Sequence, residues 1–173
     1  SEVTVGQYRA CVNAGACTAP NCDQVTEIYN WLSCNYAHNR ETHPVNYVSW
    51  TQMREFGAWV GADLPTEAQW EFAARNRGEE ILYPWGEEAP DCTRADWDNV
   101  GNFTGCNGAG TSPVCSYPAG NTAQGLCDLA GNLWEFVLDE WVENHQGAPI
   151  DGGPRCSSAD CAGNAYRVNR GGS

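Results

Sequence analysis

The ten cysteines of this chain could form disulfides or could bind a soft metal ion as thiolates. Their number is even, most lie in loops rich in Gly, Asn and Pro, and no pair has the Cys-x-x-Cys spacing of zinc ribbons and thioredoxin-like sites. We therefore expect disulfides, which form in an oxidising compartment. The cysteines are Cys11, Cys17, Cys22, Cys34, Cys92, Cys106, Cys115, Cys127, Cys156 and Cys161. Their spacing indicates local bridges among the first four and a loop closed by the last two, and the rest of the connectivity stays open.

A second set of residues could bind a metal ion through oxygen atoms. The segment from Asp128 to Glu135 offers two carboxylates with backbone carbonyls between them. Calcium takes about six to eight oxygen ligands from such groups in flexible loops. The Asp-x-Asp-x-Asp-Gly spacing of an EF-hand is absent from the sequence. In the alternative interpretation, Asp128 caps a turn and Glu135 pairs with an arginine.

Three helices are expected to position these groups. The clearest signal is Thr66 followed three residues later by Gln69, because this pattern predicts a capping box at a helix start. Apolar residues at helical spacing and flanking glycines support two further helices. The expected helices run between Thr4 and Gly15, from Ser49 or Thr51 to Gly61, and between Thr66 and Gly78.

Loops and short strands fill the rest of the chain. Residues 86–125 are rich in Gly, Asn, Asp and Pro, and a stretch of this length in a compact domain needs disulfides or bound cations to order it. Residues 133–142 carry aromatic anchors and indicate a short strand or turn. Residues 167–170 alternate in polarity and indicate the start of a strand.

Composition limits the possible functions. The chain has 173 residues, with 9 Lys and Arg against 22 Asp and Glu, which gives a net charge of −13. Nucleic-acid binding needs clustered basic residues, so neither nucleic acid nor an anionic membrane surface is an expected partner. No apolar run approaches the ~18 residues of a membrane span, so we expect no membrane insertion. The 8 tryptophans and the 42% of hydrophobic residues are enough for a buried core.

Several motifs occur together in a familiar order. They are Glu2–Tyr8, His43–Trp50, Leu64–Arg75, Tyr83–Gly86, Gly125–Phe136 and Arg167–Ser173. In this order the motifs cover nearly the whole chain, and together they resemble the formylglycine-generating-enzyme family, also called the sulfatase-modifying-factor domain. The resemblance implies an α+β, C-type-lectin-like fold that is irregular and loop-rich, with few short helices and strands and with disulfide staples.

The resemblance also implies where the family's chemistry would lie. In the oxidase branch, a reactive cysteine pair that uses copper lies just past the segment matching residues 170–173, and none of the ten cysteines occupies that position. We therefore expect one sulfatase-modifying-factor-like domain over 1–173, incomplete at both ends, because the strand that precedes Glu2 in the family is also curtailed. Copper is expected only if a catalytic segment exists beyond Ser173. No catalytic residue is assigned, and whether the protein is an enzyme stays open, with the expectation leaning against it for this chain.

Calcium is the cofactor that the resemblance implies. It carries over one site onto Asp128, Gly131, Leu133 and Glu135, where Gly131 and Leu133 would act through their backbone carbonyls. A second site falls in the loop after the Tyr-Pro-Trp-Gly turn, and its candidates are Asp96, Asp98, Asn99 and Asn102.

The leading functional hypothesis is a secreted, periplasmic or cell-surface domain that binds calcium and acts as a binding or assembly module. Its partner would be a protein or peptide that completes a sheet edge, or a second copy of the chain. One alternative is a formylglycine-generating oxidase, which converts cysteine to formylglycine in sulfatases, with its catalytic segment missing here. Another is a lectin-like receptor diversified by retroelements.

Overall fold

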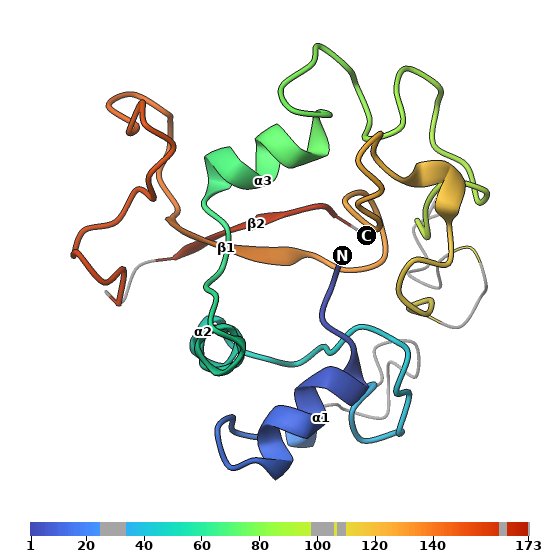
Figure 1. Cartoon of the computed structure of the whole chain (residues 1–173), viewed down its shortest axis with the longest axis vertical. Helices are drawn as coiled ribbons and strands as arrows, with labels where there is room; N and C mark the ends of the chain where they lie inside the picture. The colour runs from blue at the N-terminus through green and yellow to red at the C-terminus, as the bar shows by residue number, and fades with distance from the viewer. Residues whose placement is uncertain (25–33, 98–105, 107–109, 163–165, 173) are drawn as a thin grey trace.

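The computed structural model describes residues 1–24, 34–97, 106, 110–162 and 166–172. Long loops join the regular elements of this part of the chain (Figure 1). The elements are α1 (Val5–Asn13), η1 (Cys22–Gln24), α2 (Trp50–Val60), α3 (Glu67–Ala74), η3 (Pro118–Gly120), β1 (Glu135–Glu140) and β2 (Arg167–Arg170). The short elements and the many loops confirm the predicted fold class.

The same local signal begins each of the three α-helices. Thr4, Ser49 and Thr66 are the N-caps, and each forms a capping box with a glutamine three residues later. The predicted helix starts are therefore confirmed. Helix α2 ends at Gly61, whose φ of 75° is in the left-handed region that suits glycine.

Helix α3 is shorter than the sequence pattern predicts. It ends at Ala74, because Asn76 and Arg77 adopt left-handed φ angles of 48° and 73°. The expected stop at Gly78 was therefore wrong by four residues. Two consecutive non-glycine residues in this conformation are uncommon, although asparagine adopts it more readily than most residues, so Asn76 is a signal that the sequence analysis missed.

Strands β1 and β2 form an antiparallel pair, with Glu135 opposite Arg170 and Glu140 opposite Arg167. The pairing is irregular between Phe136 and Glu140. Strand β1 is shorter than the predicted stretch of residues 133–142, so its two flanking tryptophans lie outside it. Trp134 and Trp141 are 62% and 57% exposed, so they do not anchor a core.

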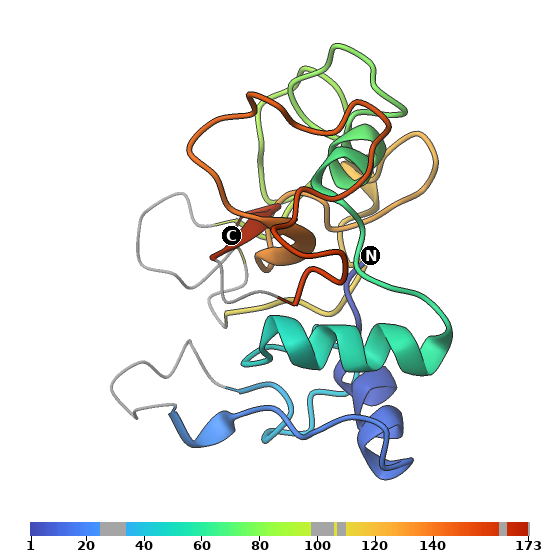
Figure 2. The same ribbon diagram turned by 90° about the vertical axis from the view of Figure 1, so that its left-hand side faces the viewer.

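The apolar residues form two separate clusters. One joins α1 and α2 and contains Val5, Tyr8 and Val45, with Phe56 packed against it. The other lies where α3 covers the strand pair and contains Trp70, Ala74, Leu129, Val137 and Val168. Figure 2 shows the resulting order, with α1 and α2 at one end, α3 at the other and the two strands between.

All ten cysteines pair in five disulfides, as the sequence predicts. The pairs are Cys11–Cys17, Cys22–Cys34, Cys92–Cys106, Cys115–Cys127 and Cys156–Cys161. Two of them involve the irregular stretch between α3 and β1, which confirms that disulfides help to order it. Five disulfides fit an oxidising compartment. Within the described residues, no helix combines the length and the apolar character that crossing a membrane requires.

Candidate functional site

The segment that leads into β1 has an unusual backbone. Asp128, Gly131 and Asn132 all have left-handed φ angles, of 60°, 87° and 64°. A Cβ atom on Gly131 would lie 2.3 Å from the carbonyl oxygen of Asp96, so only glycine fits this position. The segment 128–132 therefore packs directly against the backbone of Asp96.

Hydrogen bonds hold this region together. The backbone N–H of Asn132 donates to the carbonyl of Asp96 (2.7 Å), and its side-chain amide donates to Glu2 Oε2 (2.8 Å). The N–H of Cys115 donates to Asp128 Oδ2 (2.6 Å), and Trp70 Nε1 donates to Glu135 Oε2 (2.5 Å). Segments that are far apart in the sequence therefore meet around one group of acidic side chains.

Two carboxylate oxygens in this group are buried without a hydrogen-bond partner among the described residues. They are Glu2 Oε1 and Asp96 Oδ2. Burial, together with the carboxylates of Asp128 and Glu135, raises the pKa of Glu2 from 4.5 to about 9. Burial also raises the pKa of Asp128 and of Glu135. The region thus concentrates more negative charge than its own donors neutralise, and a bound cation would remove the imbalance.

The chemistry of the donors fits a hard cation, because carboxylate oxygens in an irregular loop suit calcium. The carboxylates of Glu2, Asp96, Asp128 and Glu135 influence one another's pKa, although among the described residues no three of them bring ligand oxygens within 4.8 Å of one another. The ligand atoms of Cys115, Cys127 and Asp128 do lie within 4.8 Å of one another. Those two cysteines form a disulfide, so they offer no thiolate to a metal.

Of the four residues of the second predicted calcium site, the structure describes only Asp96. Asp96 is 3% exposed and lies against the segment that contains the first site, through its carbonyl contact with Asn132. Its Oδ1 accepts from the N–H of Cys106 at 2.6 Å. Asp98, Asn99 and Asn102 lie outside the described residues. Asp96 therefore belongs to the same acidic region as Asp128.

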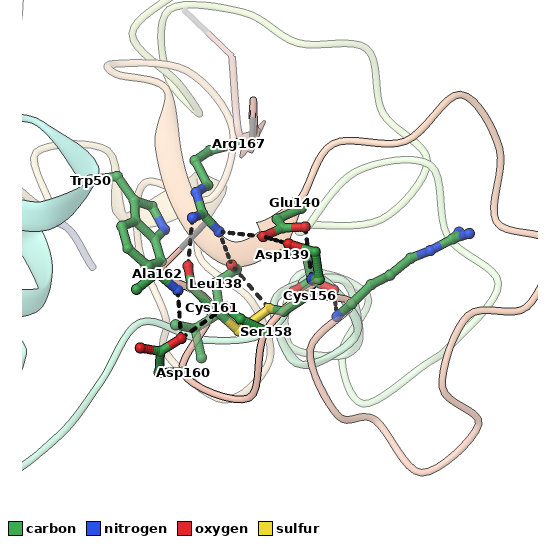
Figure 3. Close-up of polar contacts among 12 residues, drawn as sticks. Trp50, Leu138, Asp139, Glu140, Cys156, Ser158, Asp160, Cys161, Ala162 and Arg167 are labelled. Atoms are coloured by element: carbon green, nitrogen blue, oxygen red, sulfur yellow. Dashed lines mark hydrogen bonds and ion pairs between the residues drawn. A yellow bond between two sulfur atoms is a disulfide. The ribbon is translucent and has the colours of Figure 1, made fainter. Parts of the chain in front are cut away.

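A second group of buried carboxylates lies at the opposite end of β1 (Figure 3). Asp139 accepts hydrogen bonds from the backbone N–H groups of Glu67 (2.7 Å) and Arg155 (2.8 Å). Glu140 accepts from the N–H and the hydroxyl of Ser157, at 2.8 and 2.9 Å. This group holds the loop closed by Cys156–Cys161 against β1.

An arginine completes the second group. The guanidinium of Arg167 lies 3.9 Å from Glu140 Oε1 and 3.8 Å from the centre of the Trp50 ring, with both charged side chains 8% exposed (Figure 3). The Trp50 indole in turn donates to the carbonyl of Val137 at 2.9 Å. Since a cation and donors are already present, this group stabilises the fold and needs no ligand.

Sequence reasoning missed three participants in the acidic region. Glu2 and Asn132 are 130 positions apart, so no local pattern could connect them. Trp70 follows the spacing of a helix face and was interpreted as core, although its indole N–H contacts Glu135. Glu2, an acidic residue beside the apolar residues Val3 and Val5, was the one available signal.

Comparison with known proteins defines the class. The whole chain, residues 1–173, matches the model of the sulfatase-modifying factor enzyme 1-like domain, and it therefore belongs to this family. Over 111 residues it is 40% identical to the formylglycine-generating enzyme of Thermomonospora curvata, covering 60% of this chain and 35% of that one. It is also 40% identical over 103 residues to the inactive C-alpha-formylglycine-generating enzyme 2 of Bos taurus, covering 57% and 33%.

A solved structure agrees with this assignment. PvdO from Pseudomonas aeruginosa superposes with a TM-score of 0.53 and 29% sequence identity, covering 66% of this chain and 45% of that one. The chain spans about a third of the length of the curated relatives it matches. Because relatives named as enzymes and as inactive are equally similar, membership of the family does not by itself decide the activity.

Proposed function

We propose that residues 1–173 form a disulfide-stapled, calcium-binding module of this family that binds a protein or peptide partner. It would work as a secreted, periplasmic or cell-surface protein. The observation that carries the calcium proposal is the acidic region, where Glu2 Oε1 and Asp96 Oδ2 are buried without donors. Relatives named as inactive support a role that does not require oxidation.

Each residue of the region would have a definite role. Asp128 and Glu135 would bind calcium through their carboxylates, and Gly131 and Leu133 through their carbonyls. The unpaired oxygens Asp96 Oδ2 and Glu2 Oε1 would be stabilised by the positive charge of the ion. The bound ion supplies positive charge and links these ligands. Asp96 and Asn132 hold the ligand segment in shape through the 2.7 Å contact between the Asp96 carbonyl and the Asn132 N–H. Calcium would thus stabilise the contact between the N-terminal segment and the start of β1.

Calcium titration by calorimetry tests this proposal. We expect one calcium ion to bind the chelator-stripped chain, and Asp128→Asn and Glu135→Gln to lose at least tenfold in affinity because each removes a charged ligand. Glu143→Gln is the matched control, since Glu143 is an exposed carboxylate that follows the far end of β1. Absence of calcium binding, or equal binding by all variants, would refute the calcium site.

The oxidase is the second candidate, and the identity to a formylglycine-generating enzyme favours it. Copper prefers thiolates, and all ten cysteines of this chain are in disulfides, so copper would need other cysteines. Incubation with copper, oxygen and a cysteine-containing peptide distinguishes the candidates by mass spectrometry. A binding module yields no aldehyde, and any disulfide that copper and oxygen form from the peptide thiol is reversed by reduction before the mass is measured, whereas conversion to an aldehyde would establish the oxidase.

A further inference from the structure

One disulfide lies directly beside the proposed calcium ligands. Cys115 and Cys127 are bonded across 12 positions, with their Cα atoms 5.2 Å apart, and Cys127 immediately precedes Asp128. The backbone N–H of Cys115 donates to Asp128 Oδ2 at 2.6 Å. The disulfide and this hydrogen bond join the same two short segments, so the disulfide fixes the position of a donor to a proposed ligand carboxylate.

Further contacts hold the same two segments together. The N–H of Ser112 donates to Asn132 Oδ1 at 2.9 Å, and the Asn132 side-chain amide donates to the Ser112 carbonyl at 3.3 Å. Cys115 and Asp128 both have left-handed φ angles, of 61° and 60°, which residues other than glycine seldom adopt. Such a conformation persists where the surrounding bonds impose it, and here the disulfide supplies a covalent one.

The disulfide is open to a reductant on one side. Cys115 is exposed, whereas Cys127 is 3% exposed. Thiol–disulfide exchange begins when a thiolate attacks one sulfur, so it requires access to one cysteine of the pair. A dithiol supplies two electrons and two hydrogens in this exchange: it becomes a disulfide, and Cys115 and Cys127 become thiols. Sulfur atoms that are not bonded need more space than bonded ones, so Cys115 and its N–H would move away from Asp128.

We propose that the Cys115–Cys127 disulfide is a redox-sensitive switch of the calcium site, which binds calcium tightly while the disulfide is intact and weakly after a dithiol has reduced it. The inference rests on the proposed calcium site and adds its regulation. The intact disulfide keeps the Cys115 N–H on Asp128 Oδ2 and thereby holds this carboxylate in one orientation. By linkage, calcium in return opposes reduction of the disulfide by the same factor.

Calcium calorimetry on variants that lack one disulfide tests this inference. Cys115→Ser combined with Cys127→Ser should bind calcium at least tenfold more weakly than the wild-type chain. The matched control is Cys22→Ser combined with Cys34→Ser, because this disulfide also spans 12 positions and restricts the unfolded chain to a similar degree. The control should lose similar stability and keep its calcium affinity. Unchanged affinity in the first variant, or an equal loss in both, would overturn the proposal.

A double-mutant cycle separates positioning of Asp128 from a general loosening of the fold. Asp128→Ala removes the carboxylate that the disulfide is proposed to orient. In this background, loss of the Cys115–Cys127 disulfide should weaken calcium binding by no more than about twofold, because interacting residues do not contribute additively. A tenfold loss in both backgrounds would show that the disulfide does not act through Asp128, and the proposed switch would be wrong.

Reduction of the wild-type chain provides a test that needs no variant. The chain is equilibrated with dithiothreitol, its free thiols are alkylated, and mass spectrometry identifies the alkylated cysteines. Saturating calcium should raise the dithiothreitol concentration that half-reduces Cys115–Cys127 at least tenfold and leave Cys22–Cys34 unchanged. Equal protection of both disulfides would refute the switch alone if the untreated chain binds calcium. Absence of calcium binding by the untreated chain would refute the calcium site and the switch with it.

Discussion

Buried carboxylates lie at both ends of β1, but those at one end have hydrogen-bond and charge partners for all their oxygens and those at the other end do not. At the Glu140 end, both oxygens of Asp139 and both oxygens of Glu140 accept hydrogen bonds, and Arg167 supplies a positive charge. At the Glu135 end, Arg170 lies opposite Glu135 but pairs with Glu67 and Glu71, and two oxygens of the acidic region, Glu2 Oε1 and Asp96 Oδ2, have no donor among the described residues. One strand thus joins a region in which every carboxylate oxygen has a partner to a region in which two carboxylate oxygens have none among the described residues.

This difference indicates which end binds a ligand. A buried charge without a partner costs several kcal/mol, so a fold retains it where something else completes the site. The Glu140 end fixes the loop closed by Cys156–Cys161, whereas Glu2 and Glu135 at the other end line a cavity of about 590 Å³. Four experiments test this contrast, in order of decreasing expected effect.

Arg167→Met should give the largest loss of stability. It leaves Glu140 buried without its cation, which costs about 3–5 kcal/mol and lowers Tm by about 10 °C. Arg75→Met is the matched control, because Arg75 pairs with Glu71 at 3.4 Å and both side chains are more than 40% exposed, where such pairs contribute about 0–1 kcal/mol. Thermal melting with and without calcium should show the same loss for Arg167→Met. If calcium restored the Tm of Arg167→Met, the conclusion that the Glu140 end of β1 needs no ligand would be wrong.

Chelation of calcium should have the second-largest effect. A ligand at 100 times its Kd stabilises the folded state by about 2.7 kcal/mol, which corresponds to a fall in Tm of about 5–10 °C on chelation. Glu135→Gln should melt at the same temperature with and without calcium, while Glu143→Gln should keep the full response. A wild-type melting curve that chelation leaves unchanged would count against the cation site.

Gly131→Ala should be more destabilising than Gly125→Ala. Both glycines have left-handed φ angles, 87° and 79°, so both variants acquire backbone strain of roughly 1–2 kcal/mol. An added Cβ meets the Asp96 carbonyl at 2.3 Å in the first case and nothing within 4 Å in the second. Urea unfolding should therefore show an additional loss for Gly131→Ala, together with weaker calcium binding. Equal stability of the two variants would show that the contact with Asp96 is relaxed in solution.

The pH dependence of the chelated protein should be the smallest effect per step of pH, because a single carboxyl group changes the free energy of unfolding by at most about 1.4 kcal/mol per pH unit. The pKa of Glu2 is raised from 4.5 to about 9, so the folded state binds a proton that the unfolded state releases. Stability without calcium should therefore fall as pH rises from about 5 to 9. Glu2→Gln should flatten this part of the Tm profile. A profile that rises over the same range, or one that Glu2→Gln leaves unchanged, would refute the role of Glu2.

The sequence predicts features that depend on neighbouring residues. The helix starts follow from Ser or Thr with Gln three positions later, and the Cys156–Cys161 loop follows from its short separation, whereas the pairing among the first four cysteines was left open. The end of α3 was predicted at Gly78, but the left-handed residues Asn76 and Arg77 end the helix earlier. Local patterns therefore account for element starts better than for element ends.

The acidic region was predictable in part. Asp128 and Glu135 were proposed as ligands from one contiguous motif, and both lie in the acidic region, whereas calcium binding by these residues, Gly131 and Leu133 stays a prediction. Glu2 was not identified, because its contact with Asn132 spans 130 positions. The exposure of Trp134 was also missed, because an aromatic residue beside a strand resembles a core residue until the packing around it is known. Long-range contacts, rather than residue types, set the limit of sequence reasoning here.

Terbium luminescence tests the central claim most directly. Terbium replaces calcium at oxygen sites and emits when a nearby tryptophan is excited, and Trp70 Nε1 lies 2.5 Å from Glu135 Oε2. We predict strong sensitised emission from the wild-type chain, its reversal by calcium and its loss in Asp128→Asn, with Glu143→Gln unchanged. Absence of sensitised emission in the wild-type chain, or equal emission from Asp128→Asn, would contradict a cation site at the Glu135 end of β1.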